Sequence, residues 1–330
     1  MKRLSAILLA LVLLLTGCAG DGAYTDTTLY AMDTAMNLRL YDDADGAAAA
    51  WLQQYLTQLD DTLSVTKKDS AVWALNNTGR TEDALVCELL QQALLLTERT
   101  GGALDVTVYP AVQLWGFTGQ VHQVPTQEQT QAVLERIGSS HVHLSDGEAT
   151  LDRDCQVDFG ALAKGYAADQ CRAYLEEKGV CGVLSLGGNV QTVGEKPPFH
   201  QSWTVGIQNP DDPQTYLATL QVKGSKAIVT SGDYQRYFES DGVRYCHIFD
   251  PATAEPVQSD LRSVTVIADS GLLADGLSTA LFVMGLDGAA TFWQGSDDFE
   301  AVLVADDGTI YVTQGLQDAV SDCTFTVIPR

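Results

Sequence analysis

The sequence predicts an α+β fold for the greater part of this chain of 330 residues. Strand-like and helix-like segments follow one another without the regular alternation of a βαβ protein. No Pro- or Ser-rich linker divides the chain, and no internal repeat is apparent. The length after the N-terminal segment suits one large domain or two closely joined halves with a sizeable core. Residues 29–330 are therefore expected to form a single domain.

The first residues have the features of a bacterial lipoprotein signal peptide. Lys2 and Arg3 precede the apolar run Ala6–Leu15, which is too short to span a bilayer, and the run ends in Leu-Thr-Gly-Cys18. We expect residues 1–17 to be removed and Cys18 to be lipidated. A chance Cys after an ordinary cleavage site is the alternative. The small and polar residues 18–28 would then form a tether, and the domain would work outside the cytoplasm at a membrane surface.

Hydrophobic periodicity and boundary signals predict the elements of the domain. Helices are expected at Gly46–Leu63, Leu85–Arg99, Thr126–Ile137, Leu162–Lys178 and Leu273–Met284. Strands are expected at Leu29–Tyr41, Val183–Leu186, Trp203–Ile207, Leu217–Val222, Lys226–Thr230, Tyr245–Phe249, Ser263–Ala268, Ala301–Ala305 and Thr309–Thr313. Thr126 and Gln129 predict a capping box, and Asp306-Asp307-Gly308 predicts a hairpin turn.

Composition limits the class of partner. The formal net charge is −24, which argues against nucleic acid and polyanionic lipid as partners. A phosphate-bearing ligand would need a local cation or a metal ion. The six cysteines after Cys18 form neither a CxxC nor a zinc pattern, and we expect buried free thiols.

Two glycine-containing motifs are candidate ligand sites. Gly187-Gly188-Asn189 follows an apolar strand and predicts either a tight turn or a close backbone approach to a ligand. Asp158–Asp169 (DFGALAKGYAAD) opens an expected helix with small residues and a lysine. Helix N-termini attract anions, so Lys164 either meets a negatively charged ligand or pairs with Asp158. Neither motif has the spacing of a P-loop or a Rossmann fingerprint.

The apolar segment Gly271–Gly285 contains three polar groups on one helical face. Asp275, Ser278 and Thr279 stand at i, i+3 and i+4. No Lys, Arg or His lies between Arg262 and the end of this segment. The acid therefore either caps a helix or binds a metal ion, and the segment itself does not decide between these.

Read in order, the motifs resemble one family. They are the two glycine-containing motifs, Asp158–Asp169 and Gly187–Asn189, together with Thr100–Phe117 (TGGALDVTVYPAVQLWGF), Thr230–Phe238 (TSGDYQRYF), His247–Thr253 (HIFDPAT) and Ala274–Gly285 (ADGLSTALFVMG). This series resembles the ApbE family of FAD:protein FMN transferases, from about Tyr30 to the C-terminal hairpin. The resemblance implies an α+β architecture with two tunnelling-fold-like halves around a deep FAD cleft.

The resemblance also implies a reaction and its partners. FMN would pass from FAD to a Thr or Ser hydroxyl of an acceptor protein, with release of AMP and dependence on Mg²⁺. The acceptor would be a membrane redox subunit or an extracytoplasmic flavoprotein, and nucleic acid is not a partner. Two alternatives stay open: an FAD pyrophosphatase that yields FMN and AMP, and a non-catalytic flavin-binding lipoprotein.

Site residues follow from the same resemblance. The Mg²⁺ ligands would be Asp275 and Thr279, with Ser278 beside them and the backbone carbonyl of Ala161; oxygen ligands of this kind suit Mg²⁺. His247 would contact FAD and either accept the hydroxyl proton or only bind. The other FAD contacts would be Met32, Thr66, Ala103, Leu104, Asp105, Asp158 and Lys164. Asp233 would order the pocket or stabilise a turn, and Trp115 and Phe117 would pack in the core or stack on a ligand.

Overall fold

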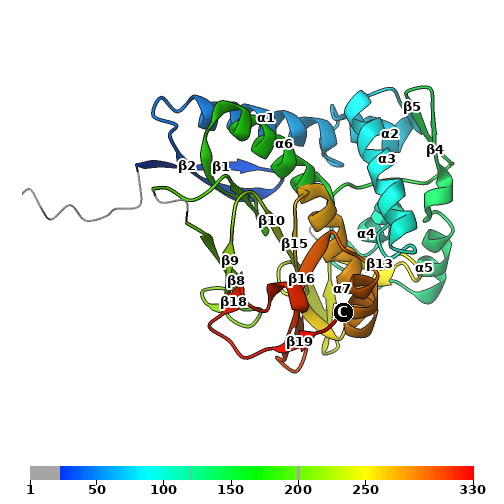
Figure 1. Cartoon of the computed structure of the whole chain (residues 1–330). Helices are drawn as coiled ribbons and strands as arrows, with labels where there is room; N and C mark the ends of the chain where they lie inside the picture. Colours follow the sequence, from blue (N-terminus) through cyan, green and yellow to red (C-terminus); the bar gives the residue numbers. More distant parts are fainter. Residues whose placement is uncertain (1–22, 120, 199–200) are drawn as a thin grey trace, which may run out of the picture.

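The computed structural model describes residues 23–119, 121–198 and 201–330. The expected signal peptide and Cys18 lie outside the described residues. The α+β class is confirmed, since helices and strands both make up large parts of the domain (Figure 1). A nine-stranded sheet, with the order β1-β2-β6-β7-β10-β15-β16-β17-β19, forms its centre.

The helices differ from the expected ones mainly in number. In chain order they are α1 Ala47–Leu63, α2 Ala71–Thr78, α3 Ala84–Arg99, α4 Tyr109–Leu114, α5 Gln127–Leu134, α6 Ala163–Lys178 and α7 Gly271–Gln294. The short helices α2 and α4 were not expected. Short 3₁₀ turns lie at Val106–Val108 (η1), Ser139–His141 and Gln314–Leu316.

The strands of the central sheet are β1 Tyr24–Ala31, β2 Thr34–Tyr41, β6 Cys181–Ser185, β7 Asn189–Val193, β10 Ala227–Gly232, β15 Leu261–Ala268, β16 Phe299–Ala305, β17 Ile310–Thr313 and β19 Thr326–Ile328. Smaller sheets contain β3 Arg80–Thr81, β4 Val142–Ser145, β5 Glu148–Leu151, β8 Trp203–Gln208, β9 Tyr216–Val222, β11 Tyr237–Ser240, β12 Val243–Cys246, β13 Phe249–Asp250, β14 Glu255–Pro256 and β18 Val320–Ser321.

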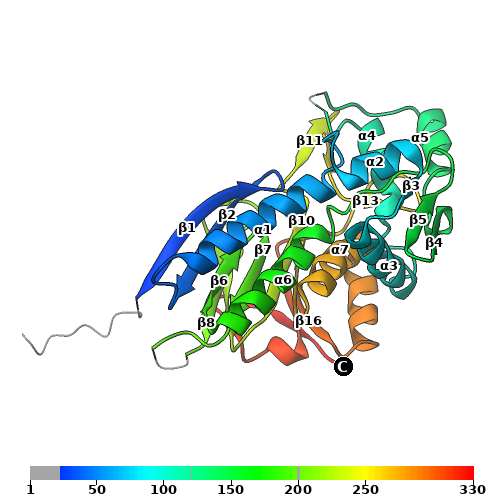
Figure 2. The same cartoon turned by 90° about the horizontal axis from the view of Figure 1, so that it is seen from above.

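Helices cover one face of the central sheet and a small sheet covers the other. Helices α1, α6 and α7 lie across the same face (Figures 1 and 2). The opposite face packs through Ile228 and Ile267 onto β8 and β9, which contribute Trp203 and Leu220 to the same buried cluster. Helices α2 to α5 gather with β3, β4 and β5 at one end of the molecule.

The expected strand Leu29–Tyr41 is wrong in one respect, because the chain folds there into a hairpin. Met32 and Asp33 have positive φ angles of 50° and 57° and form the turn between β1 and β2. Strand β1 also begins at Tyr24, so residues 24–28 are strand, although we expected them in the tether. The apolar alternation continues through both strands, which is why one long strand was expected.

Two other boundaries needed correction. The expected strand Tyr245–Phe249 is interrupted, since β12 ends at Cys246 and β13 begins at Phe249, and His247 lies between them. Helix α7 runs to Gln294 instead of Met284, with a break at Gly285, where φ is 71° and ψ is −178°. The carboxylate of Asp260 accepts a hydrogen bond from the amide of Leu286 just after this break.

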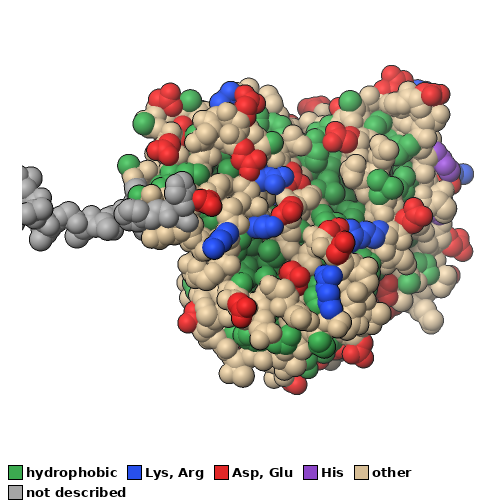
Figure 3. Space-filling model, viewed as in Figure 1, with side chains coloured by type: hydrophobic (Ala, Val, Ile, Leu, Met, Phe, Trp, Pro, Cys, Tyr) green, Lys and Arg blue, Asp and Glu red, His purple; other side chains and the backbone are tan. Residues whose placement is uncertain are grey.

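Local signals were interpreted correctly where they are strongest. Thr126 and Gln129 form the predicted capping box of α5, and residues 306–308 connect β16 to β17. The six cysteines after Cys18 are free. Helix α7 is long and apolar enough to cross a membrane by composition alone, but it packs in the core against β10, β15 and β16. Acidic side chains are scattered over the face in Figure 3, and the fewer basic ones lie mostly toward its middle.

Candidate functional site

Two turns meet at one end of the central sheet. One is the Met32–Asp33 turn, and the other is Gly187–Gly188, between β6 and β7, whose φ angles are 68° and 92°. A Cβ atom on Gly187 would lie 2.4 Å from the Thr34 hydroxyl oxygen, so the two turns are in contact. The Thr230 amide donates to the Gly188 carbonyl at 3.1 Å and brings the end of β10 beside them. The expected tight turn is confirmed.

The N-terminal halves of α6 and α7 touch through two glycines. A Cβ on Gly165 would lie 2.2 Å from the Gly271 carbonyl oxygen, and one on Gly271 would lie 2.4 Å from the Gly165 carbonyl oxygen. These positions accept no side chain without separating the helices. The two helix starts are therefore held at close range.

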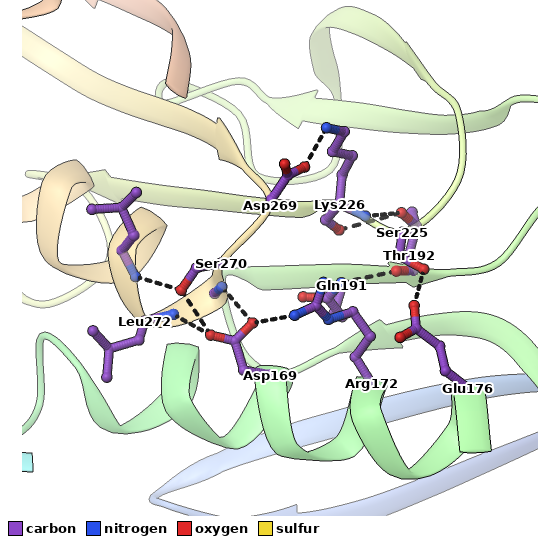
Figure 4. Close-up of polar contacts among 12 residues, drawn as sticks. Asp169, Arg172, Glu176, Gln191, Thr192, Ser225, Lys226, Asp269, Ser270 and Leu272 are labelled. Atoms are coloured by element: carbon purple, nitrogen blue, oxygen red, sulfur yellow. Dashed lines mark hydrogen bonds and ion pairs between the residues drawn. The ribbon is translucent and has the colours of Figure 1, made fainter. Parts of the chain in front are cut away.

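Asp169 of α6 fixes the start of α7 (Figure 4). Its carboxylate accepts hydrogen bonds from the Ser270 hydroxyl at 2.9 Å and from the amides of Gly271 and Leu272 at 2.7 and 3.0 Å. Ser270 in turn accepts from the Leu273 amide at 3.2 Å. The first amides of α7 are satisfied in this way without Asp275.

Asp275 reaches across the same junction. Its side chain is buried, and Oδ2 accepts a hydrogen bond from the Gly165 amide at 2.8 Å. One of the two alternatives from the sequence was that Asp275 caps its own helix. It does not, because its carboxylate accepts a hydrogen bond from an amide in the first turn of α6. That bond uses Oδ2 only.

Ser278 and Thr279 differ in their surroundings. The Ser278 hydroxyl is fully buried, donates to the Asp275 carbonyl at 2.9 Å and lies 2.8 Å from the Ser231 hydroxyl. Thr279 is half-buried, and its hydroxyl lies 3.3 Å from Ser231. Thr279 is thus the better placed of the two for a ligand, because both partners of Ser278 are already provided by the protein. Sequence reasoning missed Ser231, although it belongs to the motif Thr230–Phe238.

A tight turn precedes α6. The amides of Leu162 and Ala163 both donate to the Phe159 carbonyl at 2.8 Å, and partly buried Ala161 lies within this turn. Asp158 Oδ1 accepts from the Gly160 amide at 2.8 Å, and Lys164 Nζ donates to the Gly160 carbonyl at 3.3 Å. The acid and the lysine thus share one small turn.

The ionisation of Asp158 is shifted by this environment. Burial raises the pKa of the carboxyl above its ordinary value, and the Gly160 hydrogen bond and the charges of Arg236 and Lys164 oppose the rise. Both cations therefore lie close enough to act on the turn. Lys164 can meet an anionic ligand and the acid at the same place.

His247 enters the site from the segment between β12 and β13. Its amide donates to the Arg236 carbonyl at 3.0 Å, and its ring Nδ1 is buried without a hydrogen-bond partner among the described residues. Burial lowers the pKa of the imidazole to about 4, assisted by the charges of Arg236 and Lys164. The ring is therefore neutral at pH 7 and able to accept a proton.

Four further expected residues lie in the loops after α1 and α3. Thr66 is exposed after α1, and its hydroxyl lies 3.2 Å from that of Ser64. Partly buried Ala103 precedes Leu104, whose side chain is buried and lies where a Cβ on Gly276 would touch it at 3.1 Å. The Leu104 side chain belongs to the core, so only its backbone remains for a ligand.

Asp105 is also engaged by the protein. Its Oδ1 accepts hydrogen bonds from the amide of Thr107 at 2.8 Å and from its hydroxyl at 2.6 Å, and so caps η1. Asp233 accepts from Arg262 of β15 and Arg244 of β12 at 3.1 and 3.4 Å, so it connects these two strands. Trp115 and Phe117 are buried in an aromatic cluster with Phe249, and core packing is their role here.

The donor set of the site is rich in oxygen. Among the residues that the structure describes, no group of three or more His, Cys, Asp or Glu side chains is arranged to hold a metal ion. An ion at Asp275 would therefore have one carboxylate, a hydroxyl, backbone carbonyls and oxygens from substrate or water. This donor chemistry fits Mg²⁺ and not zinc.

Residues 32–303 match the ApbE family. An FAD:protein FMN transferase of Vibrio cholerae is 34% identical over 291 residues, which cover 84% of this chain and 87% of the relative. One of Salmonella typhimurium is 37% identical over 257 residues, or 73% of each chain. The crystal structure of the ApbE protein of Thermotoga maritima has a TM-score of 0.84 at 30% identity and covers 90% of this chain and 99% of the other.

Fold and site together define a protein of the flavin transferase class, with the same architecture as the Thermotoga maritima structure. The match extends over most of the described domain and includes the turns, the junction of α6 with α7 and the segment around His247. The chain belongs to the ApbE family.

Proposed function

We propose that this chain is an FAD:protein FMN transferase that acts on a Thr or Ser hydroxyl of an acceptor protein and requires Mg²⁺. Family membership supports the transfer of FMN from FAD to protein. The observation that carries the finer proposal is the junction of α6 and α7, where the buried carboxylate of Asp275 accepts a hydrogen bond from the Gly165 amide in the first turn of α6. The redox subunits and flavoproteins named above would be the acceptors.

The reaction exchanges the phosphoanhydride bond between FMN and AMP for a phosphoester bond to the acceptor protein. The acceptor hydroxyl oxygen forms a bond to the phosphorus of the FMN half of FAD, and the bond from that phosphorus to the oxygen of AMP breaks. The hydroxyl proton goes to a base, and AMP leaves with the electron pair. Negative charge increases on oxygens that are already anionic, so a nearby cation is the main requirement.

The residues of the junction fit a Mg²⁺ ion. Asp275, Thr279 and the Ala161 carbonyl would hold it. Ser278 would stabilise the Asp275 backbone, because its hydroxyl donates a hydrogen bond to the Asp275 carbonyl. When bound, the ion supplies charge neutralisation at the diphosphate. The fit rests on oxygen donors around a single buried carboxylate.

The other residues bind or accept a proton. Lys164, in the first turn of α6, would pair with the diphosphate, and Asp158 would shape the same pocket. Neutral His247 would accept the hydroxyl proton, because its buried Nδ1 has no partner among the described residues. Met32, Thr66 and the backbone of residues 103–105 would surround the flavin and the adenosine.

One incubation separates this function from its two alternatives. The purified protein is mixed with FAD, Mg²⁺ and a peptide that carries a target Thr. Transfer gives covalent flavin on the peptide, pyrophosphatase action gives free FMN and AMP, and simple binding leaves FAD unchanged. Bound FAD without any peptide-dependent covalent flavin would contradict the proposal.

The place of action is part of the proposal. The signal features of residues 1–17 support an extracytoplasmic protein attached to a bacterial membrane through lipidated Cys18. Replacement of Cys18 by Ala should move the protein from the membrane fraction to the soluble one, while the activity of the purified domain remains. Membrane retention of the Cys18→Ala protein would argue against the anchor.

A further inference from the structure

Arg236 connects two segments that are distant in the sequence, the buried aromatic cluster and the segment that carries His247. Its side chain donates from Nη2 to the Phe117 carbonyl at 3.0 Å, and its own carbonyl accepts from the His247 amide at 3.0 Å. Phe117 lies in the buried aromatic cluster, 5.6 Å from Phe238 and 5.7 Å from Phe249 between ring centroids. Arg236 therefore joins the loop after α4 to the segment of the proposed base.

The charge of Arg236 also acts at the site. Apart from burial, Arg236 is the first of the two cations that disfavour protonation of His247, and it acts on Asp158 as well. Lys164 is the second cation in both cases. Guanidinium stays protonated at any working pH, so this positive charge is permanent.

We propose that Arg236 is a positioning residue that holds the His247 segment to the loop after α4 and keeps a fixed positive charge near the imidazole. The inference rests on the proposed function, in which His247 accepts the proton of the acceptor hydroxyl. A carbonyl that holds the His247 backbone and a side chain that holds Phe117 come from the same residue.

The fixed charge of Arg236 opposes an effect of the substrate on the protonation of His247. The diphosphate of FAD is anionic, and an anion near an imidazole favours the protonated ring. A protonated His247 would no longer accept a proton from the acceptor. The permanent charge of Arg236 opposes this effect, so the ring stays a base when FAD is bound.

Titration of the His247 ring by NMR tests the inference without FAD or acceptor. The chain has five histidines, and the signal lost in His247→Gln identifies the ring. In Arg236→Gln, we expect the His247 titration midpoint to rise by about half to one pH unit. Arg236→Lys keeps the charge and should stay close to wild type.

Arg244→Gln is the matched control. It removes one positive charge from the β11–β12 hairpin, but Arg244 already pairs with Asp233 and Glu239, and it is not among the groups that shift the pKa of His247. We expect its His247 titration to match wild type. In Arg236→Gln, the midpoint of the acidic limb of the kcat/KM profile for transfer should move to higher pH by the same amount as the His247 titration midpoint. Arg236→Lys should return it to the wild-type pH.

Each outcome has a definite meaning. An unchanged His247 midpoint in Arg236→Gln would overturn the inference, as would an Arg236→Lys protein that titrates like Arg236→Gln. If Arg236→Gln fails to fold, Arg236→Met replaces it as the variant without the charge: its His247 midpoint should lie above those of wild type, Arg236→Lys and Arg244→Gln, and a midpoint equal to theirs would overturn the inference. Wild-type protein that transfers no FMN would remove the proposed function but leave the titration result standing.

Discussion

Asp275 uses one carboxylate oxygen to hold Gly165 and leaves the other outside that bond, so its two functions can be separated. In Asp275→Asn, the amide oxygen can still accept from the Gly165 amide, while the charge is lost. We expect the melting temperature to stay within a few degrees and FMN transfer to fall by at least about 100-fold. Activity assays over a range of Mg²⁺ concentrations check this. Unchanged turnover at limiting Mg²⁺ would contradict the metal assignment.

Ser278 and Thr279 are adjacent in sequence and should respond oppositely to mutation. Ser278→Ala removes the closer of the two hydroxyl partners of Ser231 and should cost about 1–2 kcal/mol of unfolding free energy, with little change in Mg²⁺ requirement. Thr279→Val keeps the shape but removes the hydroxyl, and the Mg²⁺ concentration for half-maximal transfer should rise about tenfold or more. Denaturant unfolding and Mg²⁺ titration of both variants check the pair. The reverse pattern would identify Ser278 as the ligand.

Asp158 should stabilise the protein when it is made uncharged. Burial raises the pKa of its carboxyl in the folded state, so the folded protein keeps this proton at pH values where the unfolded chain has lost it. Stability is therefore lost as pH rises through the folded pKa. Asp158→Asn should therefore be more stable than wild type at pH 7, by on the order of 1 kcal/mol, at the expense of transfer. The gain should shrink as the pH falls and vanish only well below the ordinary pKa of 3.8, at about pH 3. Urea unfolding at both pH values measures it, and a gain that grows at low pH would contradict this sign.

At the level of elements, the close contact of α6 and α7 decides the geometry of the site. A methyl group on Gly165 would lie 2.2 Å from the Gly271 carbonyl and 2.6 Å from Asp275 Cβ. Gly165→Ala should therefore lower the unfolding free energy by about 1–3 kcal/mol and reduce transfer, because it moves Asp275 away from α6. Thermal unfolding and transfer assays are the measurements.

Gly276→Ala is the control for this change. It lies on α7, the other helix of the junction, but its Cβ would meet only the ends of leucine side chains, at 3.0–3.1 Å. The alanine also favours the helix by about 1 kcal/mol. We expect a small net effect on stability and near-normal transfer. Equal losses in Gly165→Ala and Gly276→Ala would show that the close contact has no special role.

The elements also show what the sequence can predict. Turn and cap signals are local, and they located the start of α5 and the β16–β17 hairpin correctly. The Met32–Asp33 turn has no glycine at either position of positive φ and no break in apolar alternation, so a continuous strand was the natural expectation. The break of α7 at Gly285 likewise depends on Asp260, a tertiary partner.

The candidate site needed more than local signals. Asp275 and Gly165 are 110 residues apart, and their hydrogen bond depends on two glycines whose contact no spacing rule predicts. Sequence motifs correctly selected the segments that meet. They did not distinguish buried Ser278 from half-buried Thr279, and they did not select Arg236 or Ser231, because burial and partner atoms separate these residues from their neighbours.

For the molecule as a whole, the strong negative charge of the protein should repel an anionic substrate. The net charge is −24, yet FAD carries a diphosphate. The proposed site answers this locally, with Lys164 at the start of α6, Arg236 near His247 and the oxygen donors for a divalent cation. Binding of FAD should therefore depend on these few groups and not on the surface field.

The starting point of the folded domain gives a last prediction. Strand β1 pairs Tyr24 with Tyr41 and Asp26 with Arg39, which form an ion pair at 2.8 Å, so the sheet already begins at residue 24. A chain that starts at residue 23 should keep the full β1–β2 hairpin. A chain that starts at residue 29, the boundary expected from the sequence, loses five of the eight residue pairs of that hairpin.

The two truncated chains should therefore differ in stability. The loss of five cross-strand pairs from an edge hairpin should lower the unfolding free energy by about 2 kcal/mol or more, although the exposed Asp26–Arg39 pair contributes at most about 1 kcal/mol of this. Met32 begins the turn at the other end of the same hairpin, and a loosened β1 would release it. FAD affinity should thus fall together with the melting temperature in the shorter chain. Equal melting temperatures would place the true boundary at residue 29 after all.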